Sequence, residues 1–208
     1  LVADVRRHRP ELAVDWVAEE AFVPLVALHP GVRRVIAVAL RRWRRRPFAA
    51  TTRREFAAFR AELRREPYAA VVDLQEQLKG GILSRLARGP RHGPDRATLR
   101  EPLAALFHQH HHPIAPGQHF EDRCRQLAGA ALGYAPSGPP HYGLVAPPPP
   151  AAALPAGPYV AVVHATSRAD KLWPEERWRA LIAALAGAGL AVLLPWGADD
   201  ERARSERL

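Results

Sequence analysis

The chain has 208 residues, and 48% of them are hydrophobic, a content that excludes an intrinsically disordered protein. Its single cysteine, Cys124, excludes an internal disulfide, and no apolar run approaches the roughly 20 residues needed to span a bilayer. The net charge of +9 favours an anionic partner, which leaves nucleic acids, phosphorylated ligands and anionic membrane surfaces as candidates.

The first part of the chain alternates apolar runs with segments of helical periodicity. The predicted strands span 12–18, 32–40 and 68–75, and the predicted helices span 51–65, 76–87, 97–107 and 118–132. A short helix or turn is expected between the first two strands, and Thr51 or Thr52 is expected to cap the first long helix. Nearly continuous apolar strands that alternate with helices are typical of βαβ units and a parallel sheet.

The segment 135–158 is rich in proline, glycine and alanine, and such a composition predicts a semi-rigid linker. We therefore predict domains over 1–134 and 159–208. After the linker, a strand is predicted at 159–164, followed by a helix with Pro174 in its first position, a strand at 190–196 and the start of another helix. One βαβ unit does not bury both faces of its sheet, so this second domain is expected to be incomplete.

A polar loop, "HATSRADKLW", joins the strand at 159–164 to the helix that follows it. In open α/β sheets, ligands bind at the carboxyl ends of the strands, and free N–H groups at a helix N-terminus attract anions. Thr166 and Ser167 offer hydroxyl donors and Lys171 a compact cation, as a diphosphate requires. The residues alone leave a second interpretation open, in which Lys171 is solvated and both hydroxyls only cap a turn.

Three acidic residues, Asp199, Asp200 and Glu201, follow the strand at 190–196. A carboxylate at this edge of the sheet is placed to bind ribose hydroxyls. The same acids also suit the positive end of a helix, and this second interpretation is favoured for Asp199 and Asp200.

Two further clusters suggest ligands. The basic run "RRWRRR" at 41–46 carries Trp43, which suggests either a solvated loop or a site where phosphates bind and Trp43 stacks on a base. The run "HQHHH" places His108 and His112 at the spacing of a helical zinc pair. Pro113 follows at once and no cysteine is near, so we predict an exposed helix end and no metal site.

The longest motifs, "HATSRADKLWPEERW" at 164–178 and "LPWGADDE" at 194–201, resemble the ADP-heptose:lipopolysaccharide heptosyltransferases of glycosyltransferase family 9. The runs "VDWVAEEAF", "VRRVIAVALRRWRR" and "REPLAALF" agree, so that the resemblance covers nearly the whole chain, and the loop at 164–173 is most similar to the heptosyltransferase I branch. The resemblance implies the GT-B fold, in which two Rossmann-like parallel-sheet domains face each other. The N-terminal domain would lack its first strand and the C-terminal one would be incomplete, as in a fragment truncated at both ends.

The resemblance also implies a function. Such an enzyme moves heptose, with inversion, from ADP-L-glycero-D-manno-heptose to Kdo of Kdo2-lipid A during synthesis of the lipopolysaccharide inner core. The domain at 159–208 would bind ADP-heptose, and the domain at 1–134 would bind the anionic acceptor. The implied enzyme is cytoplasmic, lies peripherally on the inner membrane, requires no cofactor or metal and binds no nucleic acid. The 208 residues alone are expected to be inactive.

By matched positions, the resemblance assigns roles to individual residues. Thr166, Ser167 and Lys171 would hold the diphosphate, and Glu201 the ribose. The residues assigned to the acceptor are Arg41, Arg42, Arg44, Arg45, Arg100 and His119. Clustered arginines suit the carboxylates of Kdo and the phosphates of lipid A. The expected general base is an aspartate upstream of Leu1, so the catalytic residue in this chain is unknown.

The sequence departs from the family at "DLQEQLKGG", where Glu76 stands in place of a glycine and Gly80 in place of a serine. A glutamate does not easily adopt the backbone that a glycine allows, so this turn is expected to differ. Two other functions stay open from the residues alone: a family member with another nucleotide sugar or acceptor, and a basic nucleic-acid-binding module.

Overall fold

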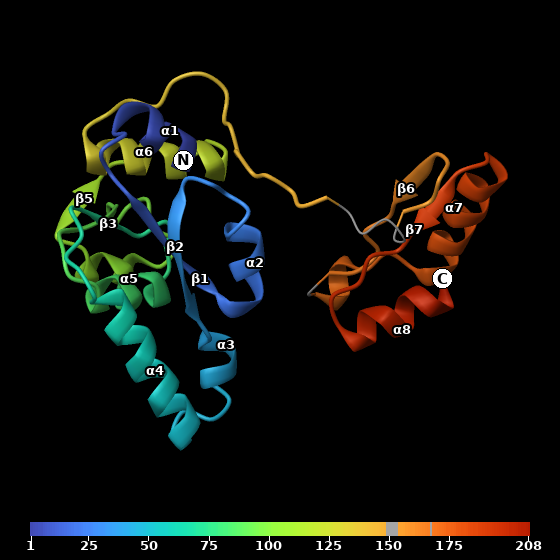
Figure 1. The fold of residues 1–208 in the computed structure, drawn as a ribbon, viewed down its shortest axis with the longest axis horizontal. Coiled ribbons are helices and arrows are strands. Elements are labelled where there is room, and N and C mark those ends of the chain that lie inside the picture. Colours follow the sequence, from blue (N-terminus) through green and yellow to red (C-terminus); the bar gives the residue numbers. More distant parts are fainter. Residues whose placement is uncertain (149–153, 167) are drawn as a thin grey trace. The chain divides into compact units, whose positions relative to one another are not determined.

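The computed structural model describes residues 1–148, 154–166 and 168–208, which divide into two compact units, Leu1–Pro147 and Pro148–Leu208. Every strand pair is parallel: β1 with β2, β3 with β4, β4 with β5, and β6 with β7. Helices connect and cover these strands (Figure 1). The prediction of an α/β fold with parallel sheets is therefore confirmed.

The first sheet of the N-terminal unit consists of β1 (Val14–Glu19) and β2 (Val32–Val38). The short helices η1 (Glu20–Phe22) and α2 (Val23–Val26) lie between them in the chain, as the sequence predicts. Valine is the most frequent residue in both strands, and its branched side chain packs well on a pleated surface. The register pairs Trp16 with Val35.

After β2 the chain forms α3 (Leu40–Trp43) and then the long helix α4 (Ala50–Leu63). Phe59 and Leu63, one turn apart on α4, pack with Ile36, Val38 and Trp43 in the buried core. The predicted threonine cap is wrong: Ala49 is the N-cap residue without a side-chain hydrogen bond, and the Thr52 hydroxyl donates instead to the Arg46 carbonyl at 2.8 Å.

A second sheet has the order β3–β4–β5, with β3 (Val71–Val72), β4 (Arg91–Pro94) and β5 (His110–His112). The predicted helix at 76–87 is present as α5 (Leu78–Leu86), but the helix expected at 97–107 is only the 3-10 helix η2 (Pro102–Phe107). The sequence did not predict β4 or β5. The expectation that the histidine run ends a helix is wrong, because His110–His112 pair with β4.

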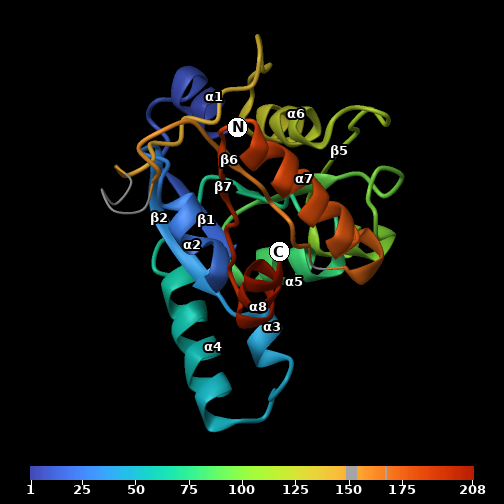
Figure 2. The ribbon, with the colours of Figure 1, turned by 90° about the vertical axis from the view of Figure 1, so that its right-hand side faces the viewer.

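The helices α1 (Val2–His8) and α6 (Phe120–Leu132) lie side by side at one end of this unit (Figure 1; Figure 2 shows the same end from the side). As predicted, α6 stops at Gly133, whose φ of 77° is the left-handed conformation that glycine adopts readily. Buried Arg125 of α6 donates to both carboxylate oxygens of buried Asp4 in α1, at 2.8 and 3.0 Å.

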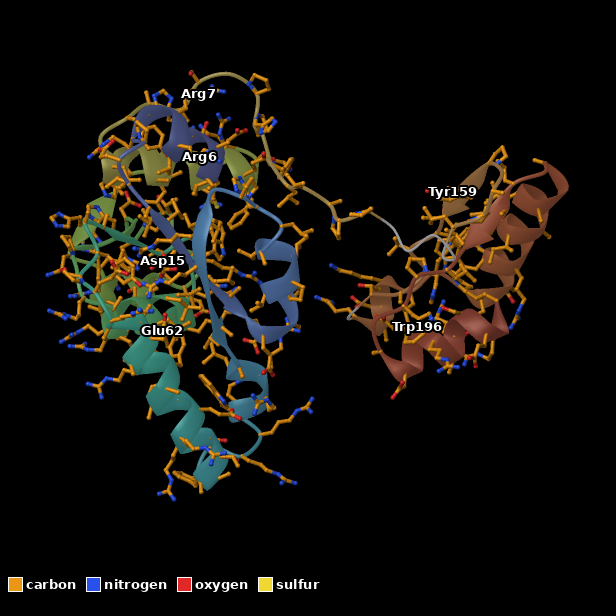
Figure 3. The ribbon with its side chains drawn as sticks, in the orientation of Figure 1. Arg6, Arg7, Asp15, Glu62, Tyr159 and Trp196 are labelled. Carbon is orange, nitrogen blue, oxygen red and sulfur yellow. The ribbon has the colours of Figure 1, made fainter. Side chains whose placement is uncertain are left out.

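Asp15 is the centre of a charged network between β1, β2 and α4 (Figure 3 labels Asp15 and Glu62). Arg33 donates to both Asp15 oxygens at 2.8 Å, and Arg34 donates to Asp15 and also to Glu62 at 2.8 Å. The Tyr68 hydroxyl adds a third donor at 3.1 Å. Burial opposes ionisation of Asp15, but the two arginines outweigh it and lower the pKa of Asp15 to about 2.

The second unit contains a smaller parallel pair, β6 (Tyr159–Ala161) and β7 (Ala191–Leu193). Between them lie η3 (Ala169–Lys171) and α7 (Glu175–Gly187), and α8 (Asp199–Arg207) follows β7. Pro174, expected as the first helical residue, is the N-cap of α7. Tyr159 and Trp196, labelled in Figure 3, lie on this unit.

The predicted linker, 135–158, contains no helix or strand over residues 135–148 and 154–158. Residues 149–153 lie outside the described residues. Of the helices in the described part of the chain, none combines the length and the apolar character that a membrane crossing requires.

Candidate functional site

The loop after β6 is fixed at its base by His164, which is only 3% exposed. The His164 Nε2 atom lies 2.8 Å from the Ser205 hydroxyl of α8, and that hydroxyl in turn donates to the Glu201 carbonyl at 3.1 Å. The end of β6 is thereby connected to α8, so the loop between β6 and α7 starts from a defined position.

The predicted diphosphate residues follow this histidine. Thr166 and Lys171 are exposed, and Lys171 closes η3 shortly before α7 begins. Ser167 lies outside the described residues. Arg168 is paired with Asp170 at 2.5 Å, whereas no carboxylate among the described residues pairs with Lys171. Lys171 is therefore an exposed cation of this loop that no carboxylate of the described residues neutralises.

The first turn of α7 carries two acids, Glu175 and Glu176, which suit the positive end of a helix. Arg207 of α8 binds Glu175 at 2.7 Å, and Arg179 binds it at 3.3 Å. Hydrogen bonds from Arg207 lower the pKa of Glu175, so this carboxylate stays ionised and engaged. These pairs connect the start of α7 to the end of α8, on the same unit as the loop.

Glu201 lies in the first turn of α8, with Asp199 and Asp200 before it. One of its carboxylate oxygens, Oε2, accepts a hydrogen bond from the Gly197 amide at 2.8 Å. Beside it, a hollow of about 520 Å³ is lined by Trp196 and Arg202, whose guanidinium lies 5.4 Å from the centre of a Trp196 ring. Trp196 is labelled in Figure 3. The turn 194–201 therefore offers an aromatic surface and a carboxylate close together in the chain.

The arginines predicted to bind the acceptor differ in whether carboxylates of the described residues already pair with them. Arg42 donates to Glu20 at 2.9 Å and to Glu55 at 2.7 Å, and the pKa of Arg42 is raised by these bonds. The Arg41 guanidinium lies 5.7 Å from the centre of the Phe22 ring. Arg44 and Arg45 are exposed, and no acid of the described residues pairs with them. Arg44 and Arg45 are therefore the more available cations.

Trp43, within the same basic run, is not available to a ligand. Its side chain is buried in the core, and its Nε1 atom donates to Glu55 Oε2 at 2.7 Å. The hypothesis that Trp43 stacks on a nucleic-acid base is wrong, because the ring has no free face.

The two remaining acceptor candidates lie on other segments. Arg100 is exposed and follows the buried Leu99, between β4 and η2. His119 is the N-cap residue of α6, and its side chain is 78% exposed, with Nδ1 3.9 Å from a Glu121 oxygen. Both side chains are free to approach a ligand.

A buried pair that the sequence did not predict lies beneath the turn at 73–77. The His108 Nε2 atom is hydrogen-bonded to Asp73 Oδ2 at 3.0 Å, and Asp73 Oδ1 accepts from the Gln75 amide at 2.9 Å. A Cβ atom at Gly93 would lie 2.1 Å from the His108 ring, and one at Gly80 would lie 2.3 Å from Asp73 Oδ1. Glycine at 80 and 93 is what lets the pair form.

The turn continues into Glu76, the one non-glycine residue with a positive φ in the part of the chain that the structure describes. Its φ of 56° is the conformation that a glycine would adopt easily, so the expectation that a glutamate avoids this backbone is wrong. The Glu76 carboxylate binds Arg123 of α6 at 2.6 Å, and its carbonyl accepts from the Glu101 amide at 3.1 Å. These contacts hold the strained residue in place.

Two substitutions at Glu76 separate the strain from the ion pair. Both Glu76→Gly and Glu76→Ala remove the bond to Arg123, but only glycine relieves the left-handed backbone. We expect the glycine variant to have a free energy of unfolding about 1 kcal/mol higher than the alanine variant, as measured by urea denaturation. Equal stability of the two variants would contradict a left-handed conformation at this residue.

The histidine cluster is a stack of rings on two strands. His92 of β4 lies with ring centres 4.6 Å from His110 and 5.3 Å from His112 of β5, and His92 Nδ1 is 3.0 Å from His112 Nε2. Burial lowers the pKa of His92 to about 4, so the His92 ring is neutral at neutral pH. Within the described ranges, no three His, Cys, Asp or Glu residues are placed to hold a metal ion.

Residues 56–208 match the sequence profile of glycosyltransferase family 9 (heptosyltransferase). The chain belongs to this family, as its motifs predict. Two similar proteins are both called lipopolysaccharide heptosyltransferase 1: that of Escherichia coli K12 is 44% identical over 209 residues, and that of Pseudomonas aeruginosa is 40% identical. The alignments cover 100% of this chain but 66% and 59% of those proteins.

Solved structures show the same relationship. E. coli heptosyltransferase WaaC with ADP superimposes with a TM-score of 0.88 at 42% identity, over 99% of this chain and 65% of WaaC. WaaC with ADP-2-deoxy-2-fluoro heptose superimposes with a TM-score of 0.83. The prediction of the GT-B fold is confirmed by this agreement, and the chain spans less than two thirds of these relatives.

Proposed function

We propose that the protein carrying this chain is an inverting heptosyltransferase that moves heptose from ADP-L-glycero-D-manno-heptose to Kdo of Kdo2-lipid A. The observation that carries the proposal is the motif at 164–178, which lies at the carboxyl end of a parallel strand and contains Lys171, an exposed cation with no counter-ion among the described residues. The relatives named lipopolysaccharide heptosyltransferase 1, and WaaC with ADP and a fluorinated ADP-heptose, support the same donor.

In this proposal the second unit binds the donor. Thr166, Ser167 and Lys171 hold the diphosphate, because hydroxyls and a compact cation match its oxygens. Glu201 holds the ribose through Oε1, since Oε2 is engaged with Gly197. The donor needs no metal here, since Lys171 and the loop supply the positive field.

The first unit binds the acceptor. The exposed Arg44 and Arg45 carry most of the attraction for Kdo carboxylates and lipid phosphates, with Arg41, Arg42, Arg100 and His119 also contributing. The enzyme works in the cytoplasm at the surface of the inner membrane, where such an acceptor is anchored. No residue of the chain is assigned as general base.

The test is a transfer assay with the enzyme from its complete reading frame. Incubation with ADP-heptose and Kdo2-lipid A is expected to release ADP and to add one heptose to the acceptor, as seen by mass spectrometry. Lipid A without Kdo is the control and is expected to accept nothing. Transfer from another nucleotide sugar, or to lipid A without Kdo, would contradict the proposal and favour another member of the family.

Replacing Arg44 by alanine tests the acceptor assignment. The loss of one charge-assisted hydrogen bond is expected to weaken acceptor binding by about 1–3 kcal/mol, with the affinity for ADP unchanged. The measurement is the acceptor KM, beside ADP titration by calorimetry. Arg60→Ala, which removes an exposed arginine from α4, is the matched control and is expected to change neither value. If Arg44→Ala weakens the binding of ADP and of the acceptor equally, the assignment of the acceptor to the first unit and the donor to the second is refuted.

A further inference from the structure

We propose that the turn between α3 and α4, residues 44–49, docks the enzyme on an anionic lipid bilayer by inserting Phe48 among the lipid headgroups. We call these six residues the arginine–phenylalanine turn. The inference deepens the proposed function, in which the acceptor is a lipid, by naming the surface that meets the membrane around that acceptor.

Phe48 is the most exposed large hydrophobic residue in the described part of the chain, with 88% of its surface open to solvent. Pro47 before it is also exposed. The next aromatic residues along the chain behave differently: Phe59 is buried, and Phe56 packs edge-on against Trp43 with ring centres 5.8 Å apart. A phenyl ring that contacts no core and projects into water is typical of an interfacial membrane contact.

The charged residues nearest Phe48 in the sequence are all arginines, up to Glu55, which pairs with Arg42. From Leu40 to Arg54 the sequence holds seven arginines and no acidic residue. Arg44, Arg45 and Arg46 flank the phenylalanine on one side, and Arg53 and Arg54 follow it in α4, all five exposed. Each arginine near an anionic surface strengthens binding to that surface, and the apolar ring between them adds the hydrophobic contribution.

The start of α4 also lacks the negative charge that a helix normally carries there. Its first turn contains no acid, and the N-cap residue Ala49 makes no side-chain hydrogen bond. Arginines at the positive end of a helix are unfavourable unless an anion is present. A hollow of about 290 Å³, lined by Arg42, Arg45, Arg46, Thr51 and Thr52, opens at this end and suits a lipid phosphate.

The position of the turn fits this role. In Figures 1 and 2 the turn between α3 and α4 forms the far end of the N-terminal unit, where α4 projects away from the sheets, and Figure 3 shows nitrogen-tipped side chains around that end. The base of α4 is anchored in the core by Phe59 and Leu63. Insertion of the tip therefore requires no rearrangement of the unit.

A bilayer suits this surface better than a nucleic acid. Trp43, the aromatic ring within the arginine run, is buried with its Nε1 bonded to Glu55, so it has no face on which a base could stack. The exposed ring, Phe48, follows a proline at the tip, where it can enter an apolar layer. Binding to nucleic acid is one outcome of the test below.

The experiment is sedimentation of the complete enzyme with vesicles of phosphatidylcholine, alone or mixed with phosphatidylglycerol. These vesicles contain neither lipid A nor Kdo, so they test the surface without the acceptor site. The enzyme is expected to bind only the mixed vesicles. Phe48→Ser should lower the partition coefficient about tenfold, and Arg53→Gln about fivefold. The matched controls, Leu106→Ser for an exposed apolar residue and Arg65→Gln at the other end of α4, should bind as the wild type does.

A second measurement separates this inference from the proposed function. On a water-soluble acceptor stripped of its acyl chains, Phe48→Ser is expected to keep the wild-type rate, whereas on acceptor embedded in vesicles its KM should rise. If the enzyme binds the mixed vesicles but transfers no heptose, the proposed function is rejected and the membrane assignment stands. Any of three results would overturn the membrane assignment. Phe48→Ser could bind mixed vesicles as well as the wild type does, or the control variants could lose as much binding as Phe48→Ser. The third result is tighter binding of the enzyme to single-stranded DNA than to mixed vesicles.

Discussion

Replacing Arg125 by methionine is expected to lower the free energy of unfolding by about 3–5 kcal/mol, a large part of the stability of a typical domain. Arg125 and Asp4 are both buried, and the guanidinium donates to both carboxylate oxygens. It also donates to the carbonyls of Ser137 and Gly138, at 3.2 and 3.1 Å, which fixes the chain after α6. Without Arg125, these acceptors and a buried carboxylate lose their donors.

A double variant shows whether the cost comes from the orphaned charge. Arg125→Met with Asp4→Leu removes both charges, so its free energy of unfolding is expected to be well above that of Arg125→Met alone. Chemical denaturation of the complete protein, followed by circular dichroism, gives both values. If the losses in the free energy of unfolding from the two substitutions simply add, the stability of this region comes from packing and not from the ion pair.

Replacing Lys171 by alanine is expected to weaken the binding of ADP by about 1.5–3 kcal/mol, which is roughly a tenfold to hundredfold higher dissociation constant. The reason is that this ammonium group has no counter-ion among the described residues, so a diphosphate would bind it without displacing a protein carboxylate. Titration calorimetry with ADP measures the effect directly. The acceptor KM is expected to stay at its wild-type value.

The matched control for Lys171 is Arg177→Ala, which removes an exposed cation from the same unit, three residues into α7. If ADP is attracted by a general positive field, both variants lose the same affinity, and the specific role of Lys171 is refuted. If only Lys171→Ala loses affinity, the loop between β6 and α7 contacts the diphosphate.

Much of the fold follows from local pattern. The strands β1 and β2 were predicted because they are short apolar runs that contain β-branched residues, and the helices α4, α6 and α7 because they are longer segments of helical pattern. The strand β4, with the sequence Arg-His-Gly-Pro, carries no such signal. Its pairing with β3 and β5 depends on contacts distant in the chain, and Gly93 within it makes room for His108.

The residues of the candidate site, too, could be proposed from the sequence only where they are close together in the chain. The loop at 164–173 and the turn at 194–201 could be proposed as ligand-binding segments because their residues are contiguous. Asp73 and His108 are 35 positions apart and were not connected, although two glycines in close contact with them, Gly80 and Gly93, were visible in the sequence. Trp43 was expected at the surface because its neighbours are arginines, but Glu55, 12 residues later, accepts its indole N–H and lets it enter the core.

The left-handed glutamate at position 76 constrains how this region can change by mutation. While residue 76 is glutamate, loss of Arg123 would leave a strained backbone beside an unpaired carboxylate. If residue 76 first becomes glycine, the strain disappears and Arg123 is free to vary. In a lineage that has acquired Glu76, replacement of Arg123 thus costs little stability only after position 76 has returned to glycine. The two substitutions are therefore tolerated in one order and not in the other.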